Sequence, residues 1–205
     1  KVTIISMGPP QAEAALREAI AMGADEAILI SDRAFAGADT LATSNALAGA
    51  LRKLDYDIVF AGRQAIDGDT AQVGPEIAEH LNIPQITYVE KVEVEGDSLK
   101  VQRAWEDGYE VIKVKTPVLL TAIKELNEPR YMHMANIFET YKKEIKVWSA
   151  ADIDVDKSLL GLAGSPTKVK KSSTKEAKGQ GELVNLPAKE AAAYAVSKLK
   201  EKHYI

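Results

Sequence analysis

The hydrophobic positions of residues 1–90 alternate between short apolar runs and stretches with helical spacing. Four runs rich in β-branched residues predict buried strands at 2–6, 26–30, 58–61 and 85–89. The segments between them predict three helices, at 11–22, from Asp39 or Thr40 to Leu54, and from about Gln72 to Leu81. Strands that alternate with helices in this way predict a parallel sheet wound with right-handed crossovers.

From residue 92 the apolar positions alternate with a period of two. Val92 and Val94, then 99–105 and 110–114, are separated by polar turns and predict an antiparallel meander. The dense apolar run 117–123 predicts a central strand. A helix over 134–141 and a last strand over 145–148 follow, and the domain is expected to end near Asp156.

The carboxy-terminal part of the chain has a different composition. Residues 158–186 are rich in Gly, Ser, Thr and Lys, and 168–178 has almost no apolar side chain that could build a core. Pro187–Lys202 carries an alanine stripe and predicts a helix that needs another surface. We therefore expect an α/β domain at 1–156, a doubly wound and mostly parallel sheet with an antiparallel meander. An extended arm at 157–205 would end in a helix that packs on a partner subunit, although a frayed tail is the alternative.

Composition excludes several classes of function. The 205 residues include no cysteine and three scattered histidines, which excludes disulfides and thiolate sites and speaks against a histidine metal site. A formal charge of −4 speaks against nucleic acid as the main partner. The chain has no run of membrane-spanning length and no signal-peptide pattern, so we expect a cytoplasmic location. A small α/β hydrolase would need a nucleophile motif, which the chain lacks.

The stretch 58–81 is the strongest candidate for a ligand site. A strand ends at Gly62, a polar loop follows, and Pro75 requires the next helix to begin close to Gln72, because proline is tolerated only in a first helical turn. The free N–H groups and positive dipole end of that helix suit a phosphate. Neither a Walker lysine motif nor G-x-G-x-x-G is present, and in the alternative interpretation Asp67, Asp69 and Thr70 only cap the helix and solvate the loop.

Two other loops are expected at the same edge of the sheet. Residues 7–10, 31–40 and 62–72 all follow strands, and ligands of doubly wound sheets lie beyond the carboxyl ends of the strands. These three loops are therefore expected to surround one nucleotide.

Three stretches resemble one known family, the β subunit of electron transfer flavoprotein. They are Gly62-Arg63-Gln64-Ala65-Ile66-Asp67-Gly68-Asp69 with Thr70 and Gln72, the signature from Val101 through Glu106-Asp107-Gly108 to Pro117-Val118-Leu119-Leu120-Thr121, and Asn127-Glu128-Pro129-Arg130-Tyr131. The resemblance covers nearly the whole chain. It also implies residues before Val2, including a first strand that helps to hold the nucleotide and would be missing here.

The resemblance implies a heterodimer with an α subunit that carries its own FAD. The β subunit of this family holds AMP in the ordinary branch. In the bifurcating branch it holds a second FAD, which oxidises NADH and divides the two electrons between ferredoxin and a flavin acceptor. Phe35–Ser44 resembles the bifurcating branch more closely, so FAD is the expected cofactor and AMP the alternative. Flavins carry this chemistry themselves, so no catalytic acid or base is expected.

Carried over residue by residue, the resemblance implies a set of nucleotide contacts. Ala71 and Val73 can offer only backbone N–H groups, whereas Arg63 either neutralises a diphosphate or pairs with Asp67 at the surface. The implied cofactor-binding residues are Met7, Gly8, Asp39, Thr40, Thr43, Gly62, Arg63, Gln64, Ala65, Asp67, Gly68, Asp69, Thr70, Ala71, Gln72 and Val73.

The resemblance also implies a docking segment for dehydrogenases. Met134 and Ile137 are expected to anchor in an acyl-CoA dehydrogenase, although Met134 could instead pack in the subunit's own core. A different class of function is a nucleotide-sensing module that binds ATP or AMP without redox chemistry. The long arm and the meander of 92–114 speak against such a self-sufficient module.

Overall fold

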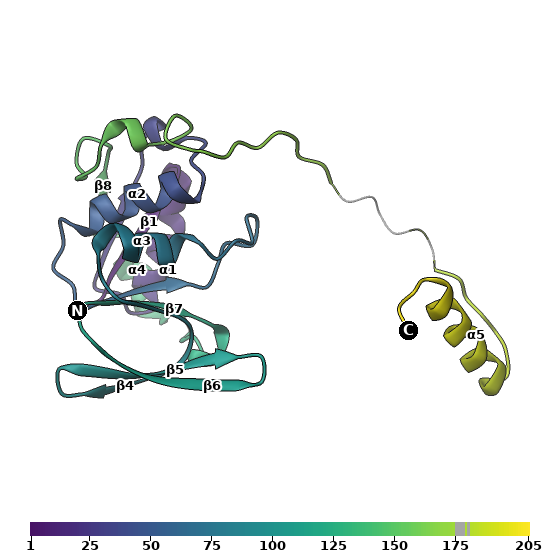
Figure 1. Ribbon diagram of the computed structural model, residues 1–205. Helices are drawn as coiled ribbons and strands as arrows, with labels where there is room; N and C mark the ends of the chain where they lie inside the picture. Colours follow the sequence, from purple (N-terminus) through teal and green to yellow (C-terminus); the bar gives the residue numbers. More distant parts are fainter. Residues whose placement is uncertain (175–178, 180) are drawn as a thin grey trace. The chain divides into compact units, whose positions relative to one another are not determined.

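The computed structural model describes residues 1–174, 179 and 181–205, and residues 175–178 and 180 of the expected arm lie outside the described residues. The chain divides into two compact units, Lys1–Lys168 and Val169–Ile205 (Figure 1). The first unit contains all eight described strands and the helices α1 (Glu13–Ala21), α2 (Thr40–Leu51), α3 (Val73–Leu81) and α4 (Met134–Thr140). The second unit contains helix α5 (Ala188–Glu201).

One sheet has three described strands, and all of them are parallel. Strand β2 (Glu26–Ile30) lies between β1 (Thr3–Met7) and β8 (Lys146–Trp148). Asp39 caps α2 as its sequence predicts, because its carboxylate accepts a hydrogen bond from the N–H of Ala42 at 3.1 Å. The predicted alternation of strand and helix is thereby confirmed in this part of the chain.

The second sheet has five strands in the order β3-β7-β4-β5-β6. Strands β3 (Ile58–Gly62), β7 (Val118–Ala122) and the start of β4 (Gln85–Glu95) are parallel. The rest of β4 pairs antiparallel with β5 (Ser98–Trp105), and β5 pairs with β6 (Gly108–Lys115), which is the predicted meander.

Strand β4 corrects one prediction. We expected a strand to end at Val89 and a separate one to follow, but β4 runs continuously from Gln85 to Glu95. Its register shifts between Ile86 and Val89, where Tyr88 has φ 55° and donates its N–H to Thr121 Oγ1 at 3.2 Å. This bulge lets one strand pass from a parallel neighbour to an antiparallel one.

The described strands form two sheets, where the sequence led us to expect one. Among the described residues, β1 and β3 are both edge strands. Ile5 of β1 and Val59 of β3 nevertheless pack against the same buried cluster, made of Leu51, Ile77, Ala78 and Leu119. The hydroxyl of Thr40, after β2, lies 3.0 Å from Gln72, after β3, so the carboxyl ends of both sheets open on the same side.

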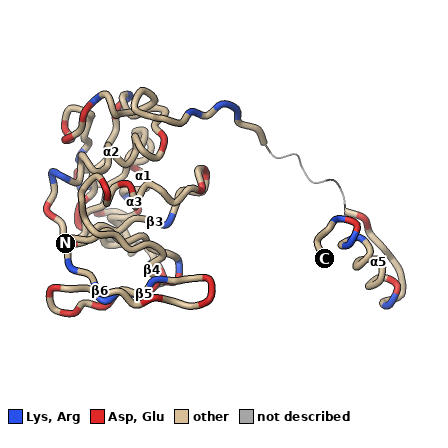
Figure 2. The backbone as a smooth tube through the Cα atoms, in the orientation of Figure 1, with Lys and Arg blue, Asp and Glu red and all other residues tan. Residues whose placement is uncertain are grey.

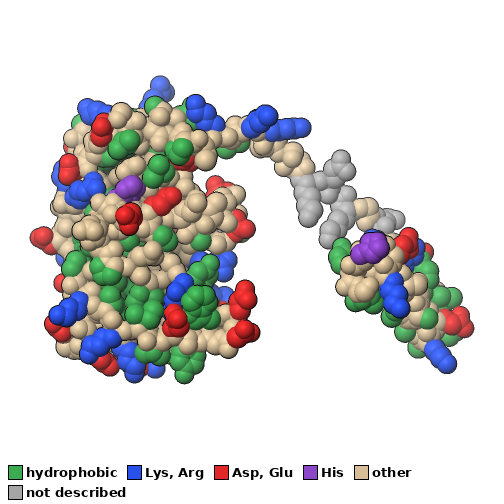
Figure 3. Space-filling view, in the orientation of Figure 1, with side chains coloured by type: hydrophobic (Ala, Val, Ile, Leu, Met, Phe, Trp, Pro, Cys, Tyr) green, Lys and Arg blue, Asp and Glu red, His purple; other side chains and the backbone are tan. Residues whose placement is uncertain are grey.

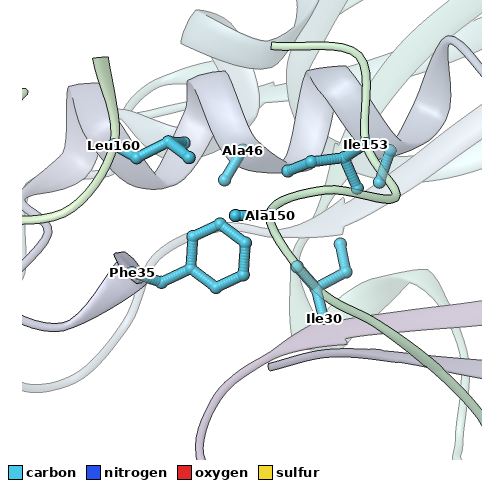
Figure 4. Packing of buried hydrophobic residues seen from close by; sticks show 7 residues of the cluster. Ile30, Phe35, Ala46, Ala150, Ile153 and Leu160 are labelled. Atoms are coloured by element: carbon cyan, nitrogen blue, oxygen red, sulfur yellow. The ribbon is translucent and has the colours of Figure 1, made fainter. Parts of the chain in front are cut away.

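A second buried cluster fastens residues 150–160 to α2. Figure 4 shows Phe35 and Ile30 beside Ala46 of α2, with Ala150, Ile153 and Leu160 around them. Leu160 is 3% exposed and Ile30 fully buried, so this segment closes the core of the first unit. The N–H of Leu162 then donates to the carbonyl of Ala36 at 3.0 Å.

The second unit has little apolar contact of its own. Helix α5 begins after Pro187 as predicted and has no buried residue.

No described helix is long and apolar enough to cross a membrane.

Candidate functional site

The loop between β3 and α3 presents a row of backbone N–H groups. Ala71 has φ 54° and Gln72, the N-cap residue of α3, has right-handed helical dihedrals of −94° and −37°. A left-handed residue followed by a right-handed one turns successive N–H groups into one concavity, which is a nest for anions. In the described part of the chain, no hydrogen bond uses the N–H groups of residues 70–74. This row and the dipole of α3 can hold a phosphate.

The acidic side chains of the loop do not cap α3. Gln72 caps the helix without a side-chain hydrogen bond, and Asp69 accepts a hydrogen bond from the side chain of Gln64 instead. The capping part of the alternative interpretation is therefore wrong, whereas Asp67, Asp69 and Thr70 are exposed to solvent, as its other part expected. Figure 2 shows acidic residues along the tip of this loop, so the backbone near α3 is the part of the loop that suits an anion.

Arg63 stands at the start of the same loop with its side chain exposed. Among the ion pairs of residues 1–174, 179 and 181–205, none joins Arg63 to Asp67. The surface pair that was the alternative role for Arg63 does not form, and the guanidinium is left available for an anion.

The first turn of α2 meets the first turn of α3 through Thr40. Its hydroxyl lies 3.0 Å from Gln72 Oε1 and 3.4 Å from Glu76 Oε1. Thr43 follows three residues later on the same face of α2, half-buried. The structure therefore brings together Thr40 and Gln72, two of the residues that the sequence pointed to, and places Thr43 on the same face of α2 as Thr40.

Met7 and Gly8 occupy the end of β1, where the N–H of Gly8 donates to the carbonyl of Ile30 at 3.0 Å. Within the described residues no hydrogen bond joins them to the 62–72 loop. They lie at the carboxyl edge of their sheet, as expected.

Asp39 anchors Ser165 and Thr167, which follow the segment 150–160 that packs on α2. Its Oδ2 accepts from the N–H of Thr167 at 3.0 Å and from the Thr167 hydroxyl at 2.8 Å, while the N–H of Asp39 donates to Ser165 Oγ at 2.8 Å. Partial burial raises the pKa of Asp39, but the hydrogen bonds from Ala42 and Thr167 lower it and together outweigh the burial. The pKa of Asp39 therefore lies below its ordinary 3.8. The carboxylate is thus already engaged by protein donors.

Replacing Asp39 with alanine is expected to lower the free energy of unfolding by about 1–2 kcal/mol near neutral pH, since it removes a helix cap and the anchor of Thr167. Because the pKa is lowered by folding, this stabilisation is complete above the ordinary pKa and disappears as the pH falls through the folded-state pKa. Urea unfolding of both proteins at pH 7 and at acidic pH measures it. Asp67→Ala, in an exposed loop position, is the matched control, and an equal loss there would contradict the role of Asp39.

The expected docking residues lie on α4, which is fixed to α1. Arg17 donates to the carbonyl of Thr140 at 2.6 Å, and Asn136 Nδ2 donates to the carbonyl of Ala21 at 3.2 Å. Met134 is 68% exposed, so the alternative in which it packs in the subunit's own core is wrong. Ile137 is half-buried and lines a groove of about 540 Å³ between the two helices.

Two residues of this region were not singled out from the sequence. Glu76 lies beside Thr40, and its Oε2 is buried without a hydrogen-bond partner among the described residues. Its spacing of four residues from Gln72 places both on one face of α3, which was the only signal available. Tyr88 has the positive φ described above, at the end of the parallel part of β4.

Comparison with known proteins identifies the family. The family described as "Electron transfer flavoprotein domain" matches residues 1–153. Electron transfer flavoprotein subunit beta of Clostridium acetobutylicum is 76% identical over 204 residues, which are 100% of this chain and 79% of the relative. Caffeyl-CoA reductase-Etf complex subunit CarD of Acetobacterium woodii is 53% identical over 207 residues, with the same coverage of 100% and 79%. Protein FixA of Azorhizobium caulinodans is 49% identical over 180 residues, or 83% of this chain and 64% of the relative. A protein with these relatives and this domain belongs to the family of electron transfer flavoprotein beta subunits.

Proposed function

We propose that this chain binds FAD at the carboxyl edge of its sheets and works in a flavin-bifurcating electron transfer flavoprotein. It would pass electrons from NADH to ferredoxin and, through the FAD of the α subunit, to an acyl-CoA dehydrogenase. The observation that carries the proposal is the row of unused N–H groups at residues 70–74, beside Thr40. The resemblance of Phe35–Ser44 to the bifurcating branch favours FAD over AMP.

The residues present fit a dinucleotide. The N–H row and the free guanidinium of Arg63 suit the two negative charges of a diphosphate. Thr40 and Thr43 offer hydroxyl groups on one face of α2 for the uncharged parts of the ligand. FAD, when bound, supplies the chemistry that takes a hydride from NADH and releases electrons singly, while this chain binds and orients it. A protein that draws electrons from NADH is expected in the cytoplasm.

The names of two relatives support an acyl-CoA dehydrogenase as acceptor. CarD belongs by name to a caffeyl-CoA reductase-Etf complex. The acryloyl-CoA reductase electron transfer subunit gamma of Anaerotignum propionicum is 47% identical over 213 residues, covering 100% of this chain and 80% of the relative. Enzymes that act on the double bond of an acyl-CoA are therefore the proposed class of partner. They would be reached through an α subunit on which the arm beyond residue 168 packs, since residues 157–167 are fastened to the first unit.

The open edges of β1 and β3 support a further strand between them, from outside these 205 residues. Their apolar residues Ile5 and Val59 share one buried cluster, although no described strand joins the two edges. The Clostridium acetobutylicum relative has residues beyond the 79% that this chain covers. A strand at this position would end at the same carboxyl edge as the proposed FAD site.

Counting the nucleotides tests the proposal. The chain is purified with its α subunit, and the released nucleotides are separated and quantified. Two FAD per heterodimer would support a bifurcating protein, whereas one FAD with one AMP would establish the ordinary branch. A complex that binds an adenine nucleotide but no flavin would instead indicate a nucleotide-sensing module.

Replacing Met134 with alanine is expected to raise the KM for the acceptor dehydrogenase about tenfold without changing the stability of the protein. Met134 is 68% exposed on α4, so its side chain contributes to docking and little to folding. Steady-state electron transfer to the dehydrogenase at varied acceptor concentration measures the effect. Val147→Ala removes an exposed apolar side chain, 56% accessible, from another element and should leave the KM unchanged. Equal kinetics for both variants would place docking elsewhere.

A further inference from the structure

Glu76 is a carboxylate that the protein leaves short of hydrogen-bond donors. It lies in the first turn of α3, with its Oε1 3.4 Å from the hydroxyl of Thr40. Its Oε2 is enclosed and has no hydrogen-bond partner among the described residues. A buried acceptor without a partner is costly, and the cost is greater when the acceptor is ionised.

The described side-chain contacts of Glu76 leave one of its two oxygens without a donor. The single hydroxyl proton of Thr40 faces both Gln72 Oε1, at 3.0 Å, and Glu76 Oε1, and it can be donated to only one of them at a time. Neither of these contacts reaches Glu76 Oε2. Among the described residues, Glu76 Oε2 therefore lacks a donor, and a ligand could supply one.

The position of Glu76 relates this cluster to the anion site. Glu76 follows Val73 by three residues, a rise of about 4.5 Å along the helix axis. Side chains of a helix point back toward its N-terminus, so the carboxylate lies over the first turn, next to the free N–H groups of residues 70–74. A group that binds Glu76 is thus very close to a phosphate held by those N–H groups.

We infer that Glu76, oriented by Thr40, accepts a hydrogen bond from a ribose hydroxyl of the bound nucleotide and so determines its specificity for ribonucleotides. This inference rests on the proposed nucleotide site. A carboxylate repels a phosphate but is satisfied by a neutral hydroxyl, and the adenosine ribose, which AMP and FAD share, bears hydroxyl groups and is bonded directly to a phosphate. In AMP the sugar separates the adenine amino group from the phosphate, so the amino group is the more distant donor.

The test measures how the complex with the α subunit, freed of nucleotide, binds AMP, 2′-deoxy-AMP and 3′-deoxy-AMP. Glu76→Gln keeps the shape and one acceptor, and Glu76→Met removes both acceptors at similar volume. Glu79→Gln, an exposed glutamate in the next part of α3, is the control. Thermal unfolding of each variant shows that it is folded.

Glu76→Met is expected to weaken AMP about tenfold or more and Glu76→Gln to weaken it less, while Glu79→Gln leaves it unchanged. One of the two deoxynucleotides should bind the unaltered complex as weakly as AMP binds the Glu76→Met variant. The affinity of the complex for this analogue should not fall further when Glu76 is replaced with methionine. Equal AMP affinity in the unaltered and Glu76 variants would overturn the inference and leave the nucleotide site standing. Equal losses on AMP and on both analogues would overturn it too. If the unaltered complex bound neither AMP nor FAD, the proposed function itself would fail.

Discussion

Replacing Ala71 with proline is expected to weaken binding of FAD or AMP about a hundredfold. Proline has no N–H and fixes φ near −65°, whereas Ala71 has φ 54° and contributes one N–H to the row at residues 70–74. The substitution removes the N–H of residue 71, and the changed φ turns the N–H of Gln72 out of the row. Each hydrogen bond to a charged group is worth about 1.5–3 kcal/mol, and about 1.4 kcal/mol changes affinity tenfold, so the loss of two gives the expected factor.

Glycine at position 71 is the matched control for this prediction. Glycine keeps the N–H and adopts positive φ without steric cost, so Ala71→Gly should bind the nucleotide as the original chain does. Relief of the strained alanine conformation should also raise the free energy of unfolding by about 1 kcal/mol. Titration calorimetry and urea unfolding of the complex measure both effects. A proline variant with unchanged affinity would show that the phosphate binds elsewhere.

The elements whose boundaries depend on local chemistry could be predicted from the sequence. Asp39 marked the start of α2, and Pro75 placed the start of α3 within one residue of Gln72. Strand β2 has the predicted bounds, because a short apolar run flanked by polar residues is itself the signal. The meander was recognised for the same reason, since its period of two is a local pattern.

Features that depend on contacts between distant residues could not be predicted. The continuity of β4 through Tyr88 requires Thr121 on a neighbouring strand to accept its N–H. The anchoring of Thr167 by Asp39 joins residues 128 positions apart. No composition rule separates residues 157–167, which are fastened to the first unit, from the Lys-rich stretch that follows them.

In the candidate site, too, features with a local cause could be predicted from the sequence, and features that depend on distant contacts could not. The backbone donors at the start of α3 followed from the loop and from Pro75, whereas the left-handed conformation of Asp69 and Ala71 did not, because neither residue is glycine. Glu76 was not singled out from the sequence. Its importance appears only when Thr40 approaches from α2, since the close contact of two helices brings their first turns together.

Gly74→Ala is expected to destabilise the chain by about 1–3 kcal/mol, although alanine is the better helix former. A Cβ at position 74 would lie 2.6 Å from Thr121 Cγ2, at the place where α3 packs on β7. Thr121 is 2% exposed and its hydroxyl accepts the N–H of Tyr88, so its side chain cannot turn away without loss of that bond. Either α3 must rise from the sheet or the bulge of β4 must open.

A second substitution distinguishes this steric cause from a general effect on the helix. Thr121→Ser removes the opposing methyl group and keeps the hydroxyl that binds Tyr88, at a cost of about 1 kcal/mol for the lost methyl. The double variant should then be only slightly less stable than Thr121→Ser alone. The free energies of unfolding in urea should give a coupling of about 1–2 kcal/mol between the two substitutions. Strictly additive losses would contradict the predicted contact. Because Val73 and Gly74 at the start of α3 supply part of the N–H row, the single Gly74 variant should also bind nucleotide more weakly, and Thr121→Ser should restore that affinity along with the stability.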